Sequence, residues 1–427
     1  MFLKKELVMR EWAISMLGTF PRLGPHMGAL HALHVAYKQG LLESEPSFIS
    51  TSSVSAIPGS IAVQRSEEKF VEAEERLVHL RKRHFVSLNP QLRINAAIDF
   101  LSILGLLVLA HRAGKIKDSV KSWTAMVALA PVAYKISEKA IKDIFNAESF
   151  LVYDNLFKLL METLDFEAIF NSPIKIEIPA VNINKAGWTL DEILSDPPLY
   201  LKGWKNEGWV SVTNFRPEDV NLDPEIRNRK YVAKLINGLR VYGHVPPGKH
   251  ENDDAIVDTA ALSNLPIHFV RNEGYSNIVV LHYNSTAEGP TDRVFKNWVE
   301  SLNRDIDITI SDITRKIILG YLRVNNDLDQ MAKQRESLRK LMGELLFRSD
   351  LDGNSREIVR RHILDMEEAL CNLSYANKKK INFLFVGSEP LPDAHFSDFT
   401  QDQMIEGINK GWKAGWDAVP KINKMIE

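Results

Sequence analysis

One stretch of the sequence, residues 47–59, combines residue types that could carry out nucleophilic chemistry. It changes from a short apolar run with β-branched residues to a run that could begin a helix, and Ser53 stands at the corner. A serine at a strand-to-helix turn can hold its Oγ away from its own backbone, at the positive end of the helix. Clusters of serine and threonine are also common in solvated loops and helix caps, so both interpretations of Ser53 stay open.

The hydrophobic pattern predicts the elements that would position Ser53. Residues 12–18 predict a buried strand that ends in a glycine turn, and residues 27–37 predict a helix closed by Gly40. With the strand and helix on either side of Ser53, this order is the start of a doubly wound α/β sheet. Later segments predict a helix at 150–170, strands at 174–182, 255–258, 277–282 and 381–386, and a closing helix at 402–419.

The closing helix carries Gly407, Gly411 and Gly415 at intervals of four residues. Residues four apart lie on one side of a helix, and glycines there allow a neighbouring backbone to approach. This stripe predicts close packing of the closing helix against another helix.

The composition is that of an ordinary soluble chain with a large core. The 427 residues are 45% hydrophobic, and 53 basic side chains stand against 55 acidic ones, so no global field would recruit nucleic acid. The single cysteine, Cys371, excludes an intrachain disulfide framework and a cysteine-built zinc site. The first residues lack the apolar core of a signal peptide, and we expect a cytoplasmic protein.

The chain is predicted to form one domain, 1–427, with a helical insertion at 66–148 and a helical block at 293–378. The insertion contains two apolar runs, 96–110 and 123–134, and each is too short to span a bilayer. They could be ordinary core helices, or they could rest on anionic lipid through the basic segment 112–121 between them. The second alternative predicts a peripheral membrane surface.

The Ser53 stretch and a second motif at 258–266, taken with the order of the elements, resemble the patatin-like phospholipase family. The family's nucleophile segment reads Gly-Thr-Ser-Ala-Gly-Ala-Ile-Asn-Gly, and residues 51–59 here read Thr-Ser-Ser-Val-Ser-Ala-Ile-Pro-Gly. The family's second signature, Asp-Gly-Gly or Asp-Gly-Ala followed by Asn-x-Pro, is similar to Asp258-Thr259-Ala260 followed by Asn264-Leu265-Pro266. The resemblance implies a three-layer α/β/α fold with a mainly parallel central sheet.

The resemblance also implies a chemistry. Ser53 falls on the family's nucleophile and Asp258 on its catalytic aspartate, which would form a Ser-Asp dyad on adjacent strand ends. Such a dyad hydrolyses acyl esters through an acyl-enzyme and needs neither histidine, metal nor cofactor. The expected partner is a lipid or acyl-ester substrate, without nucleic acid, and the oligomeric state is left open.

The family's oxyanion loop, Gly-Gly-Gly-x-Arg-Gly, is matched by Gly18-Thr19-Phe20-Pro21-Arg22-Leu23. The resemblance implies that Gly18, Thr19 and Phe20 donate backbone N–H groups to the oxyanion, while Arg22 holds the loop or a phosphate. Several family glycines are replaced here, and a β-branched Thr51 is expected to crowd the turn before Ser53. The competing hypothesis is a catalytically silent relative that binds a lipid or protein partner. The replaced glycines fall at Thr19, Phe20, Thr51 and Ser55.

Overall fold

The computed structural model describes residues 11–18, 23–79, 87–88, 151–152, 154–186, 208–240, 248–249, 254–259, 265–283, 298–348, 352–371, 379–388 and 400–427. The two apolar runs predicted in the insertion, 96–110 and 123–134, lie outside these ranges.

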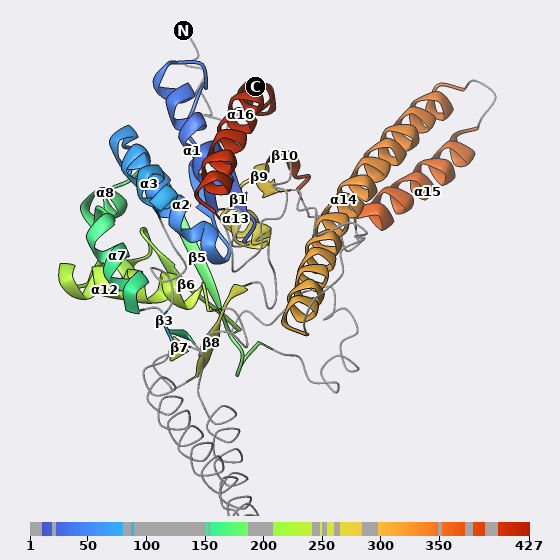
Figure 1. Ribbon diagram of the computed structural model, residues 1–427. Coiled ribbons are helices and arrows are strands. Elements are labelled where there is room, and N and C mark those ends of the chain that lie inside the picture. Colours follow the sequence, from blue (N-terminus) through green and yellow to red (C-terminus); the bar gives the residue numbers. More distant parts are fainter. Residues whose placement is uncertain are drawn as a thin grey trace, which may run out of the picture.

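A central sheet organises the molecule (Figure 1). Five strands pair in parallel in the order β10-β9-β1-β2-β5, and three further strands, β6, β7 and β8, join beyond or along β5 by antiparallel pairing. The prediction of an α/β fold with a mainly parallel central sheet is confirmed. The strands are β1 (Trp12–Met16), β2 (Phe48–Ser50), β5 (Lys175–Asn182), β6 (Trp209–Thr213), β7 (Gly248–Lys249), β8 (Ala255–Val257), β9 (Asn277–Tyr283) and β10 (Asn382–Ser388), and a separate antiparallel pair joins β3 (Ser87–Leu88) to β4 (Leu151–Val152).

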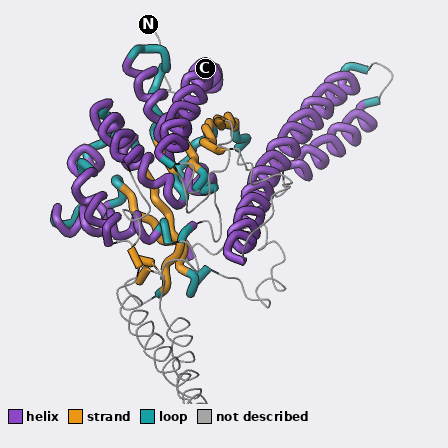
Figure 2. The backbone as a smooth tube through the Cα atoms, viewed as in Figure 1, coloured by secondary structure: helices purple, strands orange, loops and turns teal. Residues whose placement is uncertain are grey.

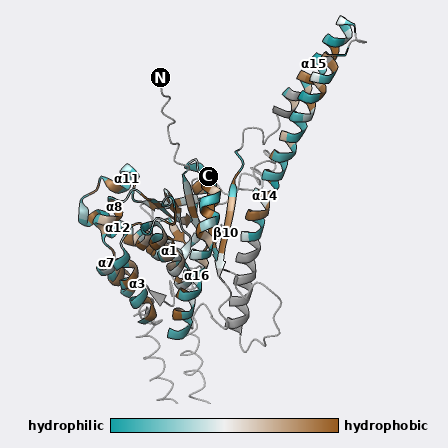
Figure 3. Cartoon of the chain, turned by 90° about the horizontal axis from the view of Figure 1, so that it is seen from above, coloured by the Kyte–Doolittle hydropathy of each residue, from teal (hydrophilic) through white to brown (hydrophobic). Residues whose placement is uncertain are grey.

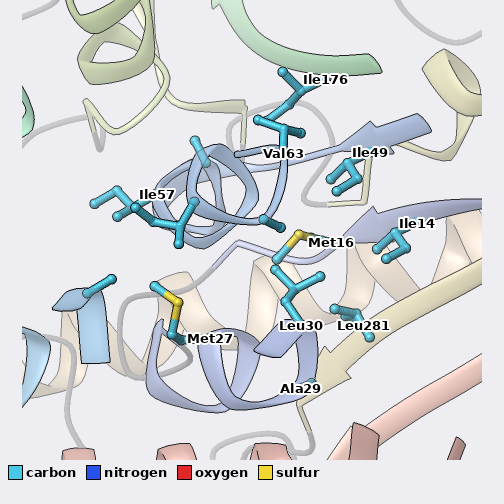
Figure 4. Packing of buried hydrophobic residues seen from close by; sticks show 14 of the residues in the cluster. Ile14, Met16, Met27, Ala29, Leu30, Ile49, Ile57, Val63, Ile176 and Leu281 are labelled. Carbon is cyan, nitrogen blue, oxygen red and sulfur yellow. The ribbon is translucent and has the colours of Figure 1, made fainter. Parts of the chain in front are cut away.

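Both faces of β1, β2 and β9 are buried over most of their length, which explains why these strands read as continuous apolar runs, whereas β10 at the edge of the sheet is partly exposed. Successive side chains of β1 alternate between two clusters: Ile14 and Met16 join the larger one, while Ala13 joins the smaller one on the opposite face. Helices cover each face, as Figure 2 shows, and Figure 4 shows the larger cluster at close range. The larger cluster includes residues of α1 (Leu23–Lys38), α2 (Ala56–Ala62), α3 (Glu67–His79) and α16 (Gln401–Ile426); the smaller includes residues of α13 (Ile267–Asn272) and is contacted by α14 (Trp298–Leu346).

Helices α1 and α16 pack at unusually short range because glycines face the neighbouring backbone. A Cβ atom added at Gly411 would lie 2.0 Å from the carbonyl oxygen of Pro25, and one added at Gly28 would lie 2.0 Å from that of Ile408. The prediction that the glycine stripe marks close helix packing is confirmed.

The helix predicted at 27–37 begins earlier, at Leu23, and two other helices also differ from their predicted bounds. The closing helix does not end at Val419 but continues through the exposed Pro420, because burial of Ile422 and Ile426 in the core holds the last turns in place. The helix predicted at 150–170 is two helices, α7 (Asp154–Thr163) and α8 (Phe166–Phe170). The second is capped by Asp165, whose side chain accepts a hydrogen bond from the Ala168 amide.

The predicted helical block 293–378 contains α14 and α15 (Gly353–Cys371), which pack side by side as a hairpin. Both Figure 1 and Figure 3 show the far end of this hairpin well away from the sheet. None of the helices within the described ranges is both long and apolar enough to cross a membrane. The assignment of the whole chain to one domain stays a prediction. The remaining helices are α11 (Pro217–Val220) and α12 (Pro224–Asn237).

Candidate active site

The site lies where two strands meet end to end along one edge of β5. β6 pairs with β5 from Glu177 to Val181 and therefore occupies one edge of β5 over that length. β2 pairs with β5 up to Glu177 and β8 pairs with it from Val181 onward, so both lie along the other edge. Since β2 runs parallel to β5 and β8 runs antiparallel, the carboxyl ends of β2 and β8 face each other.

Ser53 follows β2 and Asp258 follows β8, so this arrangement brings together two residues far apart in the sequence. The two strand ends are adjacent, as expected, although β2 and β8 share an edge of β5 and do not pair with each other. The reason is that β5 extends beyond the end of β2, and β8 returns along that extension.

Ser53 stands at a sharp turn between β2 and the helical segment formed by η2 (Ser53–Ser55) and α2. Its φ angle is 53°, in the left-handed region that non-glycine residues seldom adopt. Such a conformation costs about 1–3 kcal/mol and persists only where the surrounding structure enforces it. A strained serine at a strand-to-helix turn is typical of a nucleophile elbow, which holds the serine Oγ away from the backbone at the carboxyl end of a strand.

Ser53 Oγ donates a hydrogen bond of 2.5 Å to Asp258 Oδ2. The two side chains come from different strand ends and are both buried, with Ser53 6% exposed and Asp258 2% exposed. The Asp258 backbone is fixed by its N–H, which donates to the carbonyl oxygen of Arg240 at 3.0 Å. The carboxylate is thus held in position to accept the serine proton.

A third residue, Thr259, joins this pair, and the sequence analysis did not assign it to the site. Its hydroxyl oxygen accepts a hydrogen bond from the Ser53 backbone N–H at 3.2 Å. The same oxygen lies 2.6 Å from Ser52 Oγ and 3.3 Å from Asp258 Oδ1. The available signal was a hydroxyl residue directly after the aspartate, where the family motif has glycine.

Ser55 takes the place of the second glycine of the nucleophile motif, and its hydroxyl bonds to the turn itself. Ser55 Oγ accepts a hydrogen bond from the Ser52 backbone N–H at 2.9 Å and donates to the Ser52 carbonyl oxygen at 2.6 Å. These local bonds satisfy backbone groups at the start of a helical segment. The replacement therefore closes the turn with a side chain.

A buried carboxylate lies beside β2 on the neighbouring strand. Glu177 is in register with Ser50, and its carbonyl oxygen accepts a hydrogen bond from the Thr51 N–H at 3.2 Å. Burial raises the pKa of the Glu177 carboxyl, and the charge of Arg216, which donates to Oε1 at 2.9 Å, opposes that rise. Glu177 of β5 is therefore paired with β2 at Ser50 and with β6 at Thr213.

Thr51, expected to crowd the turn, is accommodated by Gly59 of α2. A Cβ atom added at Gly59 would lie 2.7 Å from Thr51 Cγ2, so the methyl group of Thr51 occupies the space that glycine leaves. The β-branched side chain is fully buried without displacing the strand that leads to Ser53.

Gly59→Ala should therefore lower the free energy of unfolding by about 1–2 kcal/mol, because the added methyl overpacks against Thr51. In a Thr51→Ser background, which lacks the clashing methyl, the same change should be neutral or stabilising by up to about 1 kcal/mol, since alanine favours helix over glycine. Urea unfolding of the four proteins measures the coupling. An equal cost of Gly59→Ala in both backgrounds would contradict this complementarity.

Of the four residues assigned to the oxyanion loop, Gly18, Thr19, Phe20 and Arg22, the structure describes Gly18, which lies against the serine. A Cβ atom added there would be 2.4 Å from Ser53 Cβ and 2.5 Å from the carbonyl oxygen of Ser52. Only glycine fits at this distance from the elbow. Thr19, Phe20 and Arg22 lie outside the described residues.

Comparisons with known proteins give a similarity in structure but no match in sequence. No protein-family model matches the sequence, and no curated protein matches it. Among solved structures, that of VipD from Legionella pneumophila is similar, with a TM-score of 0.35 and 12% sequence identity over 97% of this chain and 67% of that one.

Proposed function

We propose that this protein is a serine acyl-ester hydrolase that cleaves ester bonds of lipids through a Ser53–Asp258 dyad. The observation that carries the proposal is the 2.5 Å hydrogen bond from Ser53 Oγ to Asp258 Oδ2. Two further features support it: the left-handed conformation of Ser53 at a strand-to-helix turn, and the contact of Gly18 with Ser53. The residues of the two motifs that resemble the patatin-like family are those that meet here.

In the first half of the reaction, Ser53 Oγ attacks the ester carbonyl carbon while its proton passes to Asp258 Oδ2. The resulting tetrahedral intermediate collapses when its bond to the alcohol oxygen breaks. Asp258 returns the proton to that oxygen, so the alcohol leaves neutral and Ser53 carries the acyl group. No change of redox state or metal is required.

In the second half, water adds to the acyl carbonyl carbon and gives its proton to Asp258. The bond to Ser53 Oγ then breaks, Asp258 protonates that oxygen, and the carboxylic acid is released. The oxyanion in both halves needs N–H donors, for which we propose the loop that begins at Gly18 and continues through Thr19 and Phe20. One such donor contributes about 2.7–4 kcal/mol to lowering the barrier.

A fluorophosphonate probe tests the proposal, because it phosphonylates a serine only when that serine is activated as a nucleophile. We expect mass spectrometry to locate the label on Ser53 of the wild type, with labelling unaffected by a metal chelator and absent in Asp258→Asn. Ser60→Ala is a matched control, since it also removes a buried serine hydroxyl. The Ser60 hydroxyl is hydrogen-bonded to Tyr231 and not to Ser53 or Asp258. This variant should be labelled like the wild type.

Absence of labelling in the folded wild type, with probes of both short and long alkyl chain, would defeat the hydrolase proposal. That result would favour a silent protein that binds a lipid or protein partner. Labelling that persists in Asp258→Asn would defeat the dyad while leaving Ser53 as a nucleophile.

A further inference from the structure

With Asp258 ionised, as the proposed base must be, the contacts of Thr259 admit one assignment of hydrogen-bond donors. The Ser53 backbone N–H can only donate, so it uses one lone pair of Thr259 Oγ1. The Asp258 carboxylate can only accept, so its contact with Thr259 takes the threonine proton. The remaining contact, with Ser52, then has Ser52 Oγ as the donor to the second lone pair of Thr259.

This assignment makes Thr259 the point at which the nucleophile and the base are joined. Its hydroxyl binds the backbone of Ser53 on one side and the carboxylate of Asp258 on the other. It is fully buried, at 0% exposure, so water does not compete for these bonds. Since β2 and β8 do not pair with each other but meet along β5, Thr259 links their two ends directly.

We propose that Thr259 is a positioning residue of the dyad. Its acceptor oxygen holds the Ser53 amide, and with it the left-handed conformation that aims Oγ at the base. Its proton holds Oδ1 of Asp258, which turns Oδ2 toward Ser53 Oγ. The inference rests on the proposed hydrolase function, and it has one consequence for the mechanism: the Ser53 N–H is already bound to Thr259, so the oxyanion must be held by other N–H groups.

Three variants separate the hydroxyl of Thr259 from its shape. Thr259→Val keeps the shape and removes the hydroxyl, whereas Thr259→Ser keeps the hydroxyl and removes the methyl group. Thr259→Ala gives a second hydroxyl-free protein should the valine variant not fold. Thr213→Val is a matched control, because Thr213 is equally buried and its hydroxyl also accepts a backbone N–H, that of Arg216, and donates to a carboxylate, that of Asp219.

The first measurement is the rate constant of fluorophosphonate labelling at Ser53. A misplacement of reacting groups by about 1 Å can cost 100-fold in rate, so we expect Thr259→Val and Thr259→Ala to be labelled at least about tenfold more slowly than the wild type. Thr259→Ser and Thr213→Val should stay within about threefold of it, which is the spread expected from loss of one ordinary contact. A role in packing alone would give the opposite order, with valine tolerated and serine impaired.

The second measurement is amide hydrogen exchange in peptides that cover residues 48–56, and it does not depend on activity. Loss of the Thr259 acceptor should speed exchange there in Thr259→Val, while Thr259→Ser retains the protection of the wild type. Equal exchange in Thr259→Val and the wild type would overturn the inference, as would labelling of Thr259→Val at the wild-type rate. If the wild type is not labelled at all, the hydrolase proposal fails, whereas the link itself is decided by the exchange result alone.

Discussion

Ser53→Ala and Asp258→Asn should each lower kcat for ester hydrolysis by at least about a thousandfold, because removing a member of a nucleophile–base unit leaves only binding and oxyanion stabilisation to act. Ser53→Ala removes the attacking oxygen. Asp258→Asn keeps the shape of the side chain but replaces the proton acceptor at Oδ2, 2.5 Å from Ser53 Oγ, by a neutral amide. KM should change little in either variant, since both changes act on the reacting atoms.

The double variant Ser53→Ala/Asp258→Asn should be no slower than the slower single variant. Groups that act as one unit are strongly non-additive, because once the nucleophile is gone the base has no proton to accept. Steady-state hydrolysis of a chromogenic acyl ester measures all three proteins. Rate losses that multiply in the double variant would mean that Ser53 and Asp258 act independently, which the short hydrogen bond between them argues against.

Ser53→Gly provides the control for folding in this series. Glycine adopts a positive φ angle without the penalty that serine pays at φ 53°, so this variant should be as stable as the wild type or up to about 1 kcal/mol more stable. Its hydrolysis should be lost to the same extent as in Ser53→Ala. A more stable protein without activity would show that the strain at Ser53 is retained for the position of its Oγ.

The sequence predicted those parts of the fold whose signal is local. Apolar runs predicted β1, β2, β9 and β10, and alternation predicted β5. β1 reads as a continuous apolar run because it is buried on both faces, as the alternation of Ala13 and Ile14 between two clusters shows. The corner at Ser53 was predicted because small residues there separate an extended run from a helical one. The helix break before α8 was missed although its N-cap, Asp165, is a local signal. The continuation past Pro420 was missed because burial of Ile422 and Ile426, which no local pattern records, holds the last turns in place.

The site was only partly predictable for the same reason. The residue types at Ser53 and Asp258 singled them out, but the end-to-end meeting of β2 and β8 depends on β5 running past the end of β2. That length is set by pairing between segments far apart in the chain. Thr259 entered the sequence analysis only as part of the match to the family's second motif, whereas in space its hydroxyl contacts Ser52, the Ser53 amide and Asp258.

Among glycine-to-alanine substitutions in the described helices, we expect Gly411→Ala to be one of the two that lower the free energy of unfolding most. The added Cβ would lie 2.0 Å from the carbonyl oxygen of Pro25 and 2.6 Å from its carbonyl carbon, and both are backbone atoms of α1 that no rotamer change can move aside. Helices α1 and α16 would have to separate, which we expect to cost about 3 kcal/mol, only partly offset by the better helix propensity of alanine. Gly28→Ala should lower the stability by a similar amount, because a Cβ added at Gly28 of α1 would lie 2.0 Å from the carbonyl oxygen of Ile408 in α16.

Gly320→Ala is the matched control, because Gly320 lies inside α14 with no atom within 4 Å of an added Cβ. The same substitution should there stabilise the protein by up to about 1 kcal/mol, so the two changes are expected to have opposite signs. Urea unfolding followed by tryptophan fluorescence compares them, with Trp412 and Trp416 of α16 as reporters close to the affected contact.

The same separation of helices should reach the active site. Helix α1 begins at Leu23, a few residues along the chain from Gly18, which lies against Ser53. A shift of α1 is expected to disturb the oxyanion donors proposed above. We therefore expect Gly411→Ala, measured at a temperature where it remains folded, to be labelled by a fluorophosphonate more slowly than Gly320→Ala. Wild-type stability in Gly411→Ala would contradict the close packing of α1 and α16, whereas a destabilised protein labelled at the wild-type rate would separate the position of α1 from the chemistry at Ser53.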